Sequence, residues 1–531
     1  MERRKFIQAC GLGSAALLSP QLWAASWIPA DEGERPDGLA SGRRDRESYL
    51  GQVEQVIARG PFRDSWDSLA GYTPPPWYQD AKFGIFIHWG VYSVPAFVTE
   101  WYPRKMYQRG NPVWWHHRRK WGPQDRFGYK DFIPMFRAEN FDPDRWIELF
   151  KKAGARYVVP VAEHHDGFAM YDCGFSEWNA VRMGPKRDVI RALSEAARSQ
   201  GLVFGLSSHR AEHWWFFNGG KKFKSDVSDP RFESLYGPAQ PDGTQPDEAF
   251  LKDWLARSTE LVDLYRPELF YFDWWIEQPA FEPYRRKFAA FYYDRAAERG
   301  QEVVLNYKNK SFPEGAAVLD LERSRLAEIR PLVWQTDTSV SYLSWGYINP
   351  KMDKFKDAGR LIGDLVDTVS KNGVLLLNVG PAPDGTIPEP VQEILLEIGR
   401  WLEKNGEAIY GSRPWKVFGE GPTQPRQNKL FGAGEMFQPR LTDRDIRFTR
   451  NGDALYAFVM DWPRGGRVSI KSLGRKSGLA GGEISSIRLL GRPASKLEWT
   501  RAEEALTVVL PAEKPCAHAL VLELKGLLND R

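Results

Sequence analysis

The stretch Pro267-Glu268-Leu269-Phe270-Tyr271-Phe272-Asp273-Trp274-Trp275 runs from an apolar segment directly into a carboxylate flanked by aromatic side chains. A short buried strand that ends in an acid places that acid at the mouth of a parallel sheet or barrel. Tyr and Trp beside the acid can stack on a sugar face and stabilise an oxocarbenium-like transition state. A strand-end Asp can equally cap the helix that follows. This stretch alone therefore leaves a catalytic and a structural role open for Asp273.

Short apolar segments alternate with amphipathic segments from about residue 77 to residue 405. This alternation is typical of a parallel sheet, most simply an α/β fold with a (β/α)8-like, TIM-type barrel over residues 61–415. Seven strands are evident, so the eighth must be short or irregular. A doubly wound sheet is the alternative, but no glycine-rich phosphate loop follows the first strand. The strands are predicted at residues 83–89, 157–162, 202–207, 269–273, 303–307, 333–336 and 374–379, and the helices at 143–153, 189–200, 248–265, 283–299, 354–370 and 389–405.

The composition changes after Trp415. Residues 419–435 are rich in Gly, Pro and Gln, which is typical of a connection between domains. Short alternating segments at regular spacing follow, and they predict a small C-terminal β-sandwich over residues 416–531. Its strands are predicted at residues 446–449, 454–460, 467–470, 484–490, 497–500, 506–510 and 519–524.

The N-terminus carries the pattern of an export signal. Arg3 and Arg4 precede Lys5-Phe6-Ile7, and a mildly apolar run follows to Leu18. This pattern predicts a twin-arginine signal peptide over residues 1–25 and a periplasmic or secreted protein; the alternative is a cytosolic protein with a chance Arg-Arg pair. Cys10 lies too early for a lipoprotein anchor, and no later segment is long and apolar enough to span a membrane. Residues 26–60 are predicted to be a polar linker.

The composition also limits the class of partner. The 531 residues are 42% hydrophobic and carry a formal net charge of only +4, which is enough core for two or three domains. No basic block interleaves with aromatic residues, so a nucleic-acid partner is not expected. The 22 tryptophans suit a carbohydrate cleft, although some of them must be buried in the core. The chain has three cysteines and no CxxC spacing, so neither a disulfide framework nor a cysteine metal site is predicted.

Histidines and acids recur where the predicted strands end. His88 ends the first strand, Glu100 lies in the loop after it, and His164-His165-Asp166 ends the second. A single strand-end His is usually structural, but several at one barrel mouth predict a pocket for a polar ligand. Neutral imidazoles and a carboxylate can together donate to and accept from sugar hydroxyls.

One motif offers a metal alternative. His209-Arg210-Ala211-Glu212-His213 matches the HxxEH pattern of inverted zinc peptidases. That chemistry needs both histidines on one helix, whereas this motif directly follows a strand and leads into an aromatic run. We therefore expect a loop here, and the sequence gives no positive sign of a metal or other cofactor.

Several long motifs resemble the α-L-fucosidases of glycoside hydrolase family 29, in the same order along the chain. The resemblance covers about residues 60–415, and the β-rich tail suits the C-terminal sandwich of that family. The motifs are WYQDAKFGIFIHWGVYSVP at 77–95, EWY at 100–102, HHDGF at 164–168, DTVSKNGVLLLNVGP at 367–381, DGTIP at 384–388, WL at 401–402 and NGEAIYG at 405–411.

The resemblance implies a retaining exo-glycosidase that releases α-L-fucose through a covalent glycosyl-enzyme. Asp273 falls at the position of the family's nucleophile. Tyr271 stands where the family often has Trp, and Lys308 stands where an Arg is expected; Arg offers a bidentate fork and Lys a point charge. The segment around His209 also departs from commoner members. The substrate-binding residues are expected to be His88, Glu100, Trp101, His164, His165, His209, Tyr271 and Lys308.

The acid/base position varies within the family. We expect it at Glu322, with Glu277 and Glu328 as rivals, and the structural alternative for Glu322 is a surface carboxylate paired with a neighbouring arginine. The expected substrate is a fucosylated oligosaccharide or glycoconjugate. Two alternatives remain open, namely an exo-glycosidase for a galactoside or a substituted fucose, and a carbohydrate-binding protein without catalysis.

Overall fold

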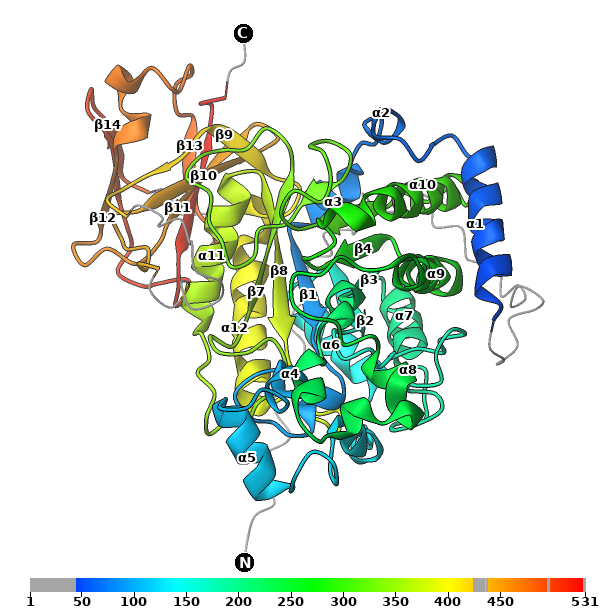
Figure 1. Cartoon of the computed structure of the whole chain (residues 1–531). Coiled ribbons are helices and arrows are strands. Elements are labelled where there is room, and N and C mark those ends of the chain that lie inside the picture. Colours follow the sequence, from blue (N-terminus) through cyan, green and yellow to red (C-terminus); the bar gives the residue numbers. More distant parts are fainter. Residues whose placement is uncertain (1–43, 424–434, 436–437, 494–496, 529–531) are drawn as a thin grey trace, which may run out of the picture. The chain divides into compact units, whose positions relative to one another are not determined.

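The computed structural model describes residues 44–423, 435, 438–493 and 497–528 (Figure 1). The predicted signal peptide at residues 1–25 and most of the predicted connection at 419–435 lie outside the described residues. Within the described residues, none of the helices combines the length and the apolar character needed to cross a membrane.

Eight parallel strands form the barrel, which confirms the predicted fold class. The hydrogen-bonded order is β6-β5-β4-β3-β2-β1-β8-β7. A parallel bridge between Asp320 and Gln335 joins the two ends of this order and closes the ring. The strand that the sequence pattern missed is β6, which is only two residues long. The strands are β1 (Phe83–Ile87), β2 (Tyr157–Glu163), β3 (Val203–Ser208), β4 (Leu269–Phe272), β5 (Val304–Tyr307), β6 (Val318–Leu319), β7 (Trp334–Ser339) and β8 (Gly373–Val379).

Alternation along the strands separates the barrel interior from the helix-covered outside. In β4, Phe270 and Phe272 belong to the cluster packed under the helices, whereas Leu269 and Tyr271 belong to the interior cluster. The next inward position after Tyr271 is Asp273, so the period of two directs this carboxylate toward the barrel mouth. The interior is tightly filled, and a Cβ on Gly84 would lie 2.3 Å from the Tyr157 ring.

The six long helices predicted in the barrel are present, with ends within four residues of the expected ones. Asp142, Asp188, Asp247 and Asp357 cap four of them by accepting a backbone N–H from the first turn. These helices are α6 (Pro143–Lys152), α7 (Val189–Ser199), α9 (Glu248–Tyr265), α10 (Glu282–Glu298), α11 (Ala358–Ser370) and α12 (Glu389–Asn405). The shorter helices are α2 (Trp66–Leu69), α3 (Pro76–Ala81), α4 (Tyr102–Lys105), α5 (Pro112–Lys120) and α8 (Glu233–Tyr236).

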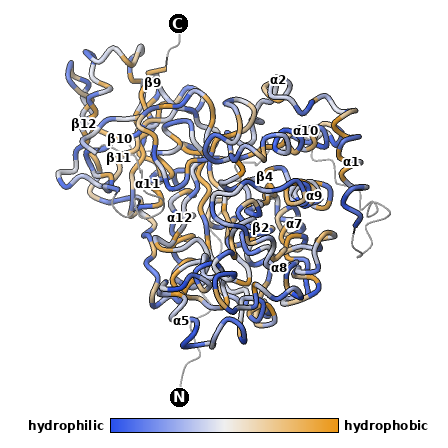
Figure 2. Tube along the Cα trace, in the orientation of Figure 1, coloured by the Kyte–Doolittle hydropathy of each residue, from blue (hydrophilic) through white to orange (hydrophobic). Residues whose placement is uncertain are grey.

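The end of the predicted polar linker is instead a helix, α1 (Arg46–Arg59), which contacts α9 and α10 (Figure 1). Arg46 pairs with Asp253 of α9 at 2.7 Å. Apolar and polar residues interleave along α1 (Figure 2), and the overall polar composition of the segment hid its helical apolar stripe. That stripe consists of the buried residues Tyr49, Leu50, Val53, Val56 and Ile57.

The C-terminal region forms two antiparallel sheets around its own hydrophobic core, as predicted for a β-sandwich. The sheet orders are β13-β16-β11-β10-β9 and β12-β15-β14. The first strand, β9, was not predicted. Arg447 of β10 pairs with Asp367 of α11 at 2.7 Å, and Lys371 pairs with the same carboxylate. The strands are β9 (Arg413–Glu420), β10 (Ile446–Asn451), β11 (Ala454–Val459), β12 (Arg467–Ile470), β13 (Ser486–Leu489), β14 (Trp499–Arg501), β15 (Leu506–Val509) and β16 (Leu520–Lys525).

The docking of α1 predicts a strong difference between two substitutions on this helix. Val53 is 1% exposed, so Val53→Asp would bury an unpaired carboxylate and should lower the free energy of unfolding by at least about 3 kcal/mol. Gln55→Asp adds the same charge on the exposed side of α1 and should change stability by less than about 0.5 kcal/mol. Denaturant unfolding of both variants checks this; equal stabilities would contradict the packing of α1.

Candidate active site

A cavity of about 690 Å³ lies at the carboxyl ends of the barrel strands. It is lined by every predicted site residue except Tyr271, and the structure adds aromatic and charged residues that the sequence did not indicate. Its lining consists of His88, Glu100, Trp101, Lys105, His164, His165, His209, Asp273, Trp274, Lys308, Glu322, Arg323, Asp337, Tyr342, Leu343 and Trp345.

A second hollow of about 760 Å³ lies near the starts of β2 and β3 and is lined by Lys151, Arg156, Lys404 and Glu407, among others. Lys151 and Lys404 belong to the last turns of α6 and α12, where cations offset the helix dipole. The Arg156 guanidinium stacks over the Tyr410 ring at 4.2 Å. The first cavity, which gathers carboxylates and histidines, is the stronger candidate for chemistry.

Asp273 follows β4 and is held by cationic and imidazole neighbours. Its Oδ2 lies 3.0 Å from His209 Nδ1 and 3.7 Å from His165 Nε2, and its Oδ1 lies 3.1 Å from Lys308 Nζ. Burial alone would raise the pKa of Asp273, but Lys308, His209 and His165 hold it well below its ordinary value. Asp273 is therefore an ionised carboxylate at neutral pH, as a nucleophile must be.

Lys308 joins Asp273 to Glu322. Its Nζ lies 3.1 Å from Asp273 Oδ1, 2.8 Å from Glu322 Oε2 and 3.3 Å from Asp337 Oδ2. Since 3.1 Å and 2.8 Å add to at most 5.9 Å, the two bridged oxygens of Asp273 and Glu322 can be no farther apart than that. Two carboxyl groups at about 5–5.5 Å are typical of retaining glycosidases, whereas about 6.5–9.5 Å is typical of inverting ones.

The pKa values of the two carboxylates are shifted in opposite directions. Burial raises the pKa of Glu322 above its ordinary value; Lys308 lowers it, while Asp337 and Asp273 raise it further, and the net shift is upward. A pair of acids with pKa values pushed in opposite directions can supply one ionised group and one proton donor. The rivals of Glu322 lie elsewhere: Glu277 Oε1 accepts a bond from Asn309 Nδ2 at 3.4 Å outside the cavity lining, and Glu328 is exposed.

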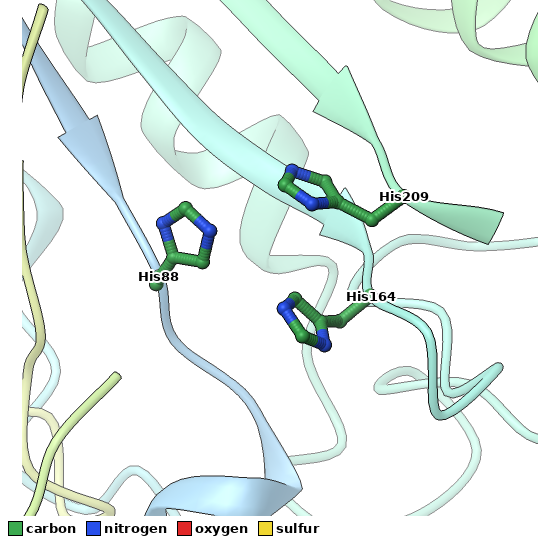
Figure 3. Close-up of side chains that lie close together, drawn as sticks. All are labelled: His88, His164 and His209. Atoms are coloured by element: carbon green, nitrogen blue, oxygen red, sulfur yellow. The ribbon is translucent and has the colours of Figure 1, made fainter. Parts of the chain in front are cut away.

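Three histidine rings from successive strand ends point into a common space (Figure 3). His88 follows β1, His164 follows β2 and His209 follows β3. Burial lowers the pKa of each, and for His88 and His164 the pKa lies well below the ordinary value. The three rings are therefore neutral at pH 7, and His88 Nδ1 is fixed by Asn378 Oδ1 at 2.7 Å. Neutral rings held this way can each donate to or accept from a ligand hydroxyl.

His165 is the charged exception. Burial would lower its pKa, but Glu212 and Asp273 raise it to about 9. Its Nδ1 bonds to the His209 carbonyl at 2.8 Å and lies 2.9 Å from Glu212 Oε2, so a backbone carbonyl and a buried carboxylate together hold the imidazolium that faces Asp273. Glu212 is a site residue that the sequence did not predict, because the HxxEH motif indicated only a metal site or a loop.

Among the described residues, two groups of side chains place possible metal-ligand atoms within 4.8 Å of one another, namely His88 with His164 and His209, and His165 with His209 and Asp273. His209 belongs to both, and its two ring nitrogens already bond to Asp273 Oδ2 at 3.0 Å and Ser207 Oγ at 3.1 Å. An ion at either group would have to displace these bonds. The HxxEH motif lies on a 3-10 turn, Arg210–Trp214, rather than on an α-helix, and His213 bonds to the His165 carbonyl instead.

Tyr271 lies beneath the cavity rather than in its lining. It is fully buried, and its hydroxyl donates toward Asp320 Oδ2 at 3.3 Å and Asp337 Oδ2 at 3.1 Å. Asp337 itself was missed because the predicted strand ended at residue 336, one position short of it. Since inward residues alternate, a prediction one residue longer would have placed Asp337 among the side chains that point into the barrel.

Glu100 fixes one wall of the cavity. Its Oε2 accepts bonds from Ser344 Oγ at 2.7 Å and from the Trp345 backbone N–H at 3.0 Å. The Trp345 ring lies 5.4 Å from the His88 ring. This loop after β7 carried no sequence signal, because its position depends on a partner more than 200 residues away.

Comparisons with known proteins agree with this geometry. The sequence model described as Alpha-L-fucosidase matches residues 49–407, and that described as Alpha-L-fucosidase C-terminal domain matches residues 438–525. The chain is 32% identical to tissue alpha-L-fucosidase of Rattus norvegicus, across 86% of this chain and 90% of the relative. It is 31% identical to tissue alpha-L-fucosidase of Homo sapiens, across 88% and 92%. The crystal structure of Thermotoga maritima alpha-fucosidase in complex with fucose matches with a TM-score of 0.70 and 30% identity, covering 87% of this chain and 100% of that one. The resemblance found in the sequence is thus confirmed, and the chain belongs to the α-L-fucosidase family.

Proposed function

We propose that this chain is a retaining, exo-acting α-L-fucosidase that releases terminal α-L-fucose from oligosaccharides or glycoconjugates. The observation that carries the proposal is the pair Asp273 and Glu322, which line one cavity, share Lys308 and have pKa values shifted in opposite directions. A binding protein without catalysis would have no use for such a pair.

The chemistry divides into two displacements. In the first, an Asp273 oxygen forms a bond to the anomeric carbon while the bond to the leaving oxygen breaks, and Glu322 donates its proton to that oxygen. In the second, Glu322 takes a proton from water, the water oxygen bonds to the anomeric carbon, and the Asp273 carboxylate leaves. Two inversions restore the starting configuration. We assign sugar binding to His88, His164, His165, His209, Glu100 and Trp101, which line the same cavity.

A panel of 4-nitrophenyl glycosides tests the proposal against its alternatives. We expect the α-L-fucoside to be hydrolysed at least about 100-fold faster than the galactosides, because a site that hydrogen-bonds one set of hydroxyls leaves groups unpaired with another. Faster hydrolysis of a galactoside would identify the related-sugar alternative. Sugar binding without hydrolysis of any fucoside, natural linkages included, would identify a binding protein and contradict the proposal.

The nucleophile assignment predicts the behaviour of Asp273→Gly. Turnover should fall at least about 10³-fold, because no other group at this strand end forms the glycosyl ester. Azide supplied with 4-nitrophenyl α-L-fucoside should enter the vacated space and attack the anomeric carbon as nitrophenolate leaves. One displacement inverts the centre, so the product should be the β-fucosyl azide, detectable by NMR.

Glu322→Gln provides the contrast for that experiment. For substrates with good leaving groups, the rate of glycosyl-enzyme formation should change little, whereas hydrolysis of the glycosyl-enzyme should slow. Azide should then react with the glycosyl-enzyme and give the α-fucosyl azide. If Asp273→Gly kept near wild-type turnover, the nucleophile would have to be sought elsewhere.

Lys308 predicts the direction of a pH shift. It lowers the pKa of both Asp273 and Glu322, so Lys308→Met should raise both. Activity is lost on the acidic side as Asp273 gains a proton and on the basic side as Glu322 loses one. Both limbs of the kcat/KM profile should therefore move to higher pH. Lys308→Arg keeps the charge and should leave the limbs close to the wild-type positions; unmoved limbs in Lys308→Met would show that Lys308 does not set them.

We also propose that residues 1–25 direct export by the twin-arginine route to the periplasm or beyond. Arg3 and Arg4 before Lys5-Phe6-Ile7, with the mildly apolar run to Leu18, support this. Replacing both arginines with lysine should retain the protein in the cytoplasm, as measured by activity in cell fractions. Export of that variant at the wild-type level would contradict the proposal.

A further inference from the structure

Glu435 lies in sequence between β9 and β10, yet its side chain is buried among barrel residues and is only 6% exposed. Its Oε1 accepts a bond from Thr338 Oγ1 of β7 at 2.7 Å. Its Oε2 lies 2.7 Å from Lys356 Nζ and 3.1 Å from Arg323 Nη1. Glu435, which precedes the C-terminal domain in sequence, thus places its carboxylate against the residue that follows Glu322.

Arg323 has a conformation that needs support. Its φ is +47°, in the left-handed region that non-glycine residues seldom occupy. Its backbone N–H donates to the Asp337 carbonyl at 2.8 Å, and its Nη1 donates to the Ser341 carbonyl at 3.3 Å as well as to Glu435. Since Glu322 is the preceding residue, whatever fixes the Arg323 backbone and side chain also fixes the direction in which Glu322 points.

Arg323 also supports the opposite wall of the cavity. Its guanidinium lies 4.5 Å from the centroid of the Trp345 ring, in the range of a cation–π contact. Trp345 lines the cavity next to His88. One guanidinium therefore connects Glu435 to both the Glu322 loop and an aromatic wall.

The charges indicate what Glu435 does for this arrangement. Arg323 and Lys356 are both buried, at 3% and 0% side-chain exposure, and Glu435 is a carboxylate within ion-pairing distance of both. The nearby Asp364 pairs with Arg325 and Arg360. Asp353 and Asp364 are further carboxylates near Arg323 and Lys356, respectively. Without the Glu435 charge, these two cations would repel each other more strongly in a buried site, and the long Arg323 side chain would shift from its place.

We propose that Glu435 is a positioning residue for the acid/base, holding Glu322 through Arg323. The inference rests on the proposed fucosidase function and extends it, because it gives the segment before the C-terminal domain a part in proton transfer. Glu435 does not belong to the cavity lining, so its effect must appear in the steps that need Glu322 and not in the attack by Asp273.

Glu435→Gln separates these steps. The value of kcat/KM for 4-nitrophenyl α-L-fucoside, whose leaving group needs little acid help, should stay within about 3-fold of wild type. The kcat/KM for a disaccharide with a sugar leaving group should fall relative to wild type by a factor at least about 10-fold larger than the factor for the nitrophenyl substrate. Azide should accelerate release from the glycosyl-enzyme and give the α-fucosyl azide, as the Asp273 carboxylate departs. Labelling with 2-deoxy-2-fluoro-fucosyl fluoride, followed by mass spectrometry, counts the active sites for normalisation.

Asp367→Asn is the matched control. Asp367 is another buried carboxylate between two cations, Lys371 and Arg447, at the contact of α11 with β10, and it does not line the cavity. The Asp367→Asn protein should have a lower melting temperature than wild type, but the ratio of its kcat/KM values for the two substrates should be unchanged. Thr338→Val removes the hydroxyl that donates to Glu435 Oε1 and accepts from Lys356 Nζ at 2.6 Å, while the Glu435 charge stays. It should change the ratio in the same direction by a smaller factor, which keeps the test available if Glu435→Gln folds poorly.

The outcomes separate the two proposals. Equal loss on both substrates and no azide product in Glu435→Gln and Thr338→Val would make Glu435 a structural residue only and overturn this inference alone. Absence of fucoside hydrolysis by the wild-type chain would overturn the proposed function and this inference with it.

Discussion

The active site depends on the charge of one buried lysine. Lys308 lies within 3.3 Å of three carboxylates, Asp273, Glu322 and Asp337, and a fourth, Asp320, lies close behind. Lys308 and the nearby His165 imidazolium are fewer than these four acids, so the crowding of carboxylates favours the protonated form of some of them. Burial and Asp337 raise the pKa of Asp320 well above its ordinary value, and the pKa of Glu322 is raised as well. The crowding of acids thus favours the protonated form of Glu322, the residue to which we assign the role of proton donor.

The barrel brings these groups together through the strict alternation of its strands. Tyr271 and Asp273 occupy successive inward positions at the end of β4, and Asp337 occupies an inward position of β7. The Tyr271 hydroxyl bonds to both Asp320 and Asp337 below the cavity. A Trp at this position would present one indole N–H and no acceptor, so Tyr271 serves the acid cluster beneath the cavity instead of the sugar above it.

The sequence predicted what depends on local periodicity and missed what depends on distant partners. Seven barrel strands and six long helices follow from apolar patterns, whereas β6 is too short to produce one, and the apolar stripe of α1 was hidden within a polar segment. Asp273 and the strand-end histidines were predictable because strand ends converge at a barrel mouth. The support of Arg323 by Glu435 joins residues 112 positions apart, and no local pattern encodes such a pair.

A lysine suits this position because of how charge moves during the two displacements. Its ammonium has three donors on one atom, which matches three carboxylates at 3.1, 2.8 and 3.3 Å. In the proposed mechanism the negative charge lies on Asp273 before the first displacement. After it, Asp273 is a neutral ester and Glu322, having given up its proton, carries the charge. The total charge around Lys308 is the same in both states. The negative charge moves from Asp273 to Glu322, and these two carboxylates lie at similar distances from the Lys308 ammonium, 3.1 and 2.8 Å. Since the lysine need not move or change its protonation, the site requires little reorganisation between the steps, which is the condition for electrostatic stabilisation of both transition states.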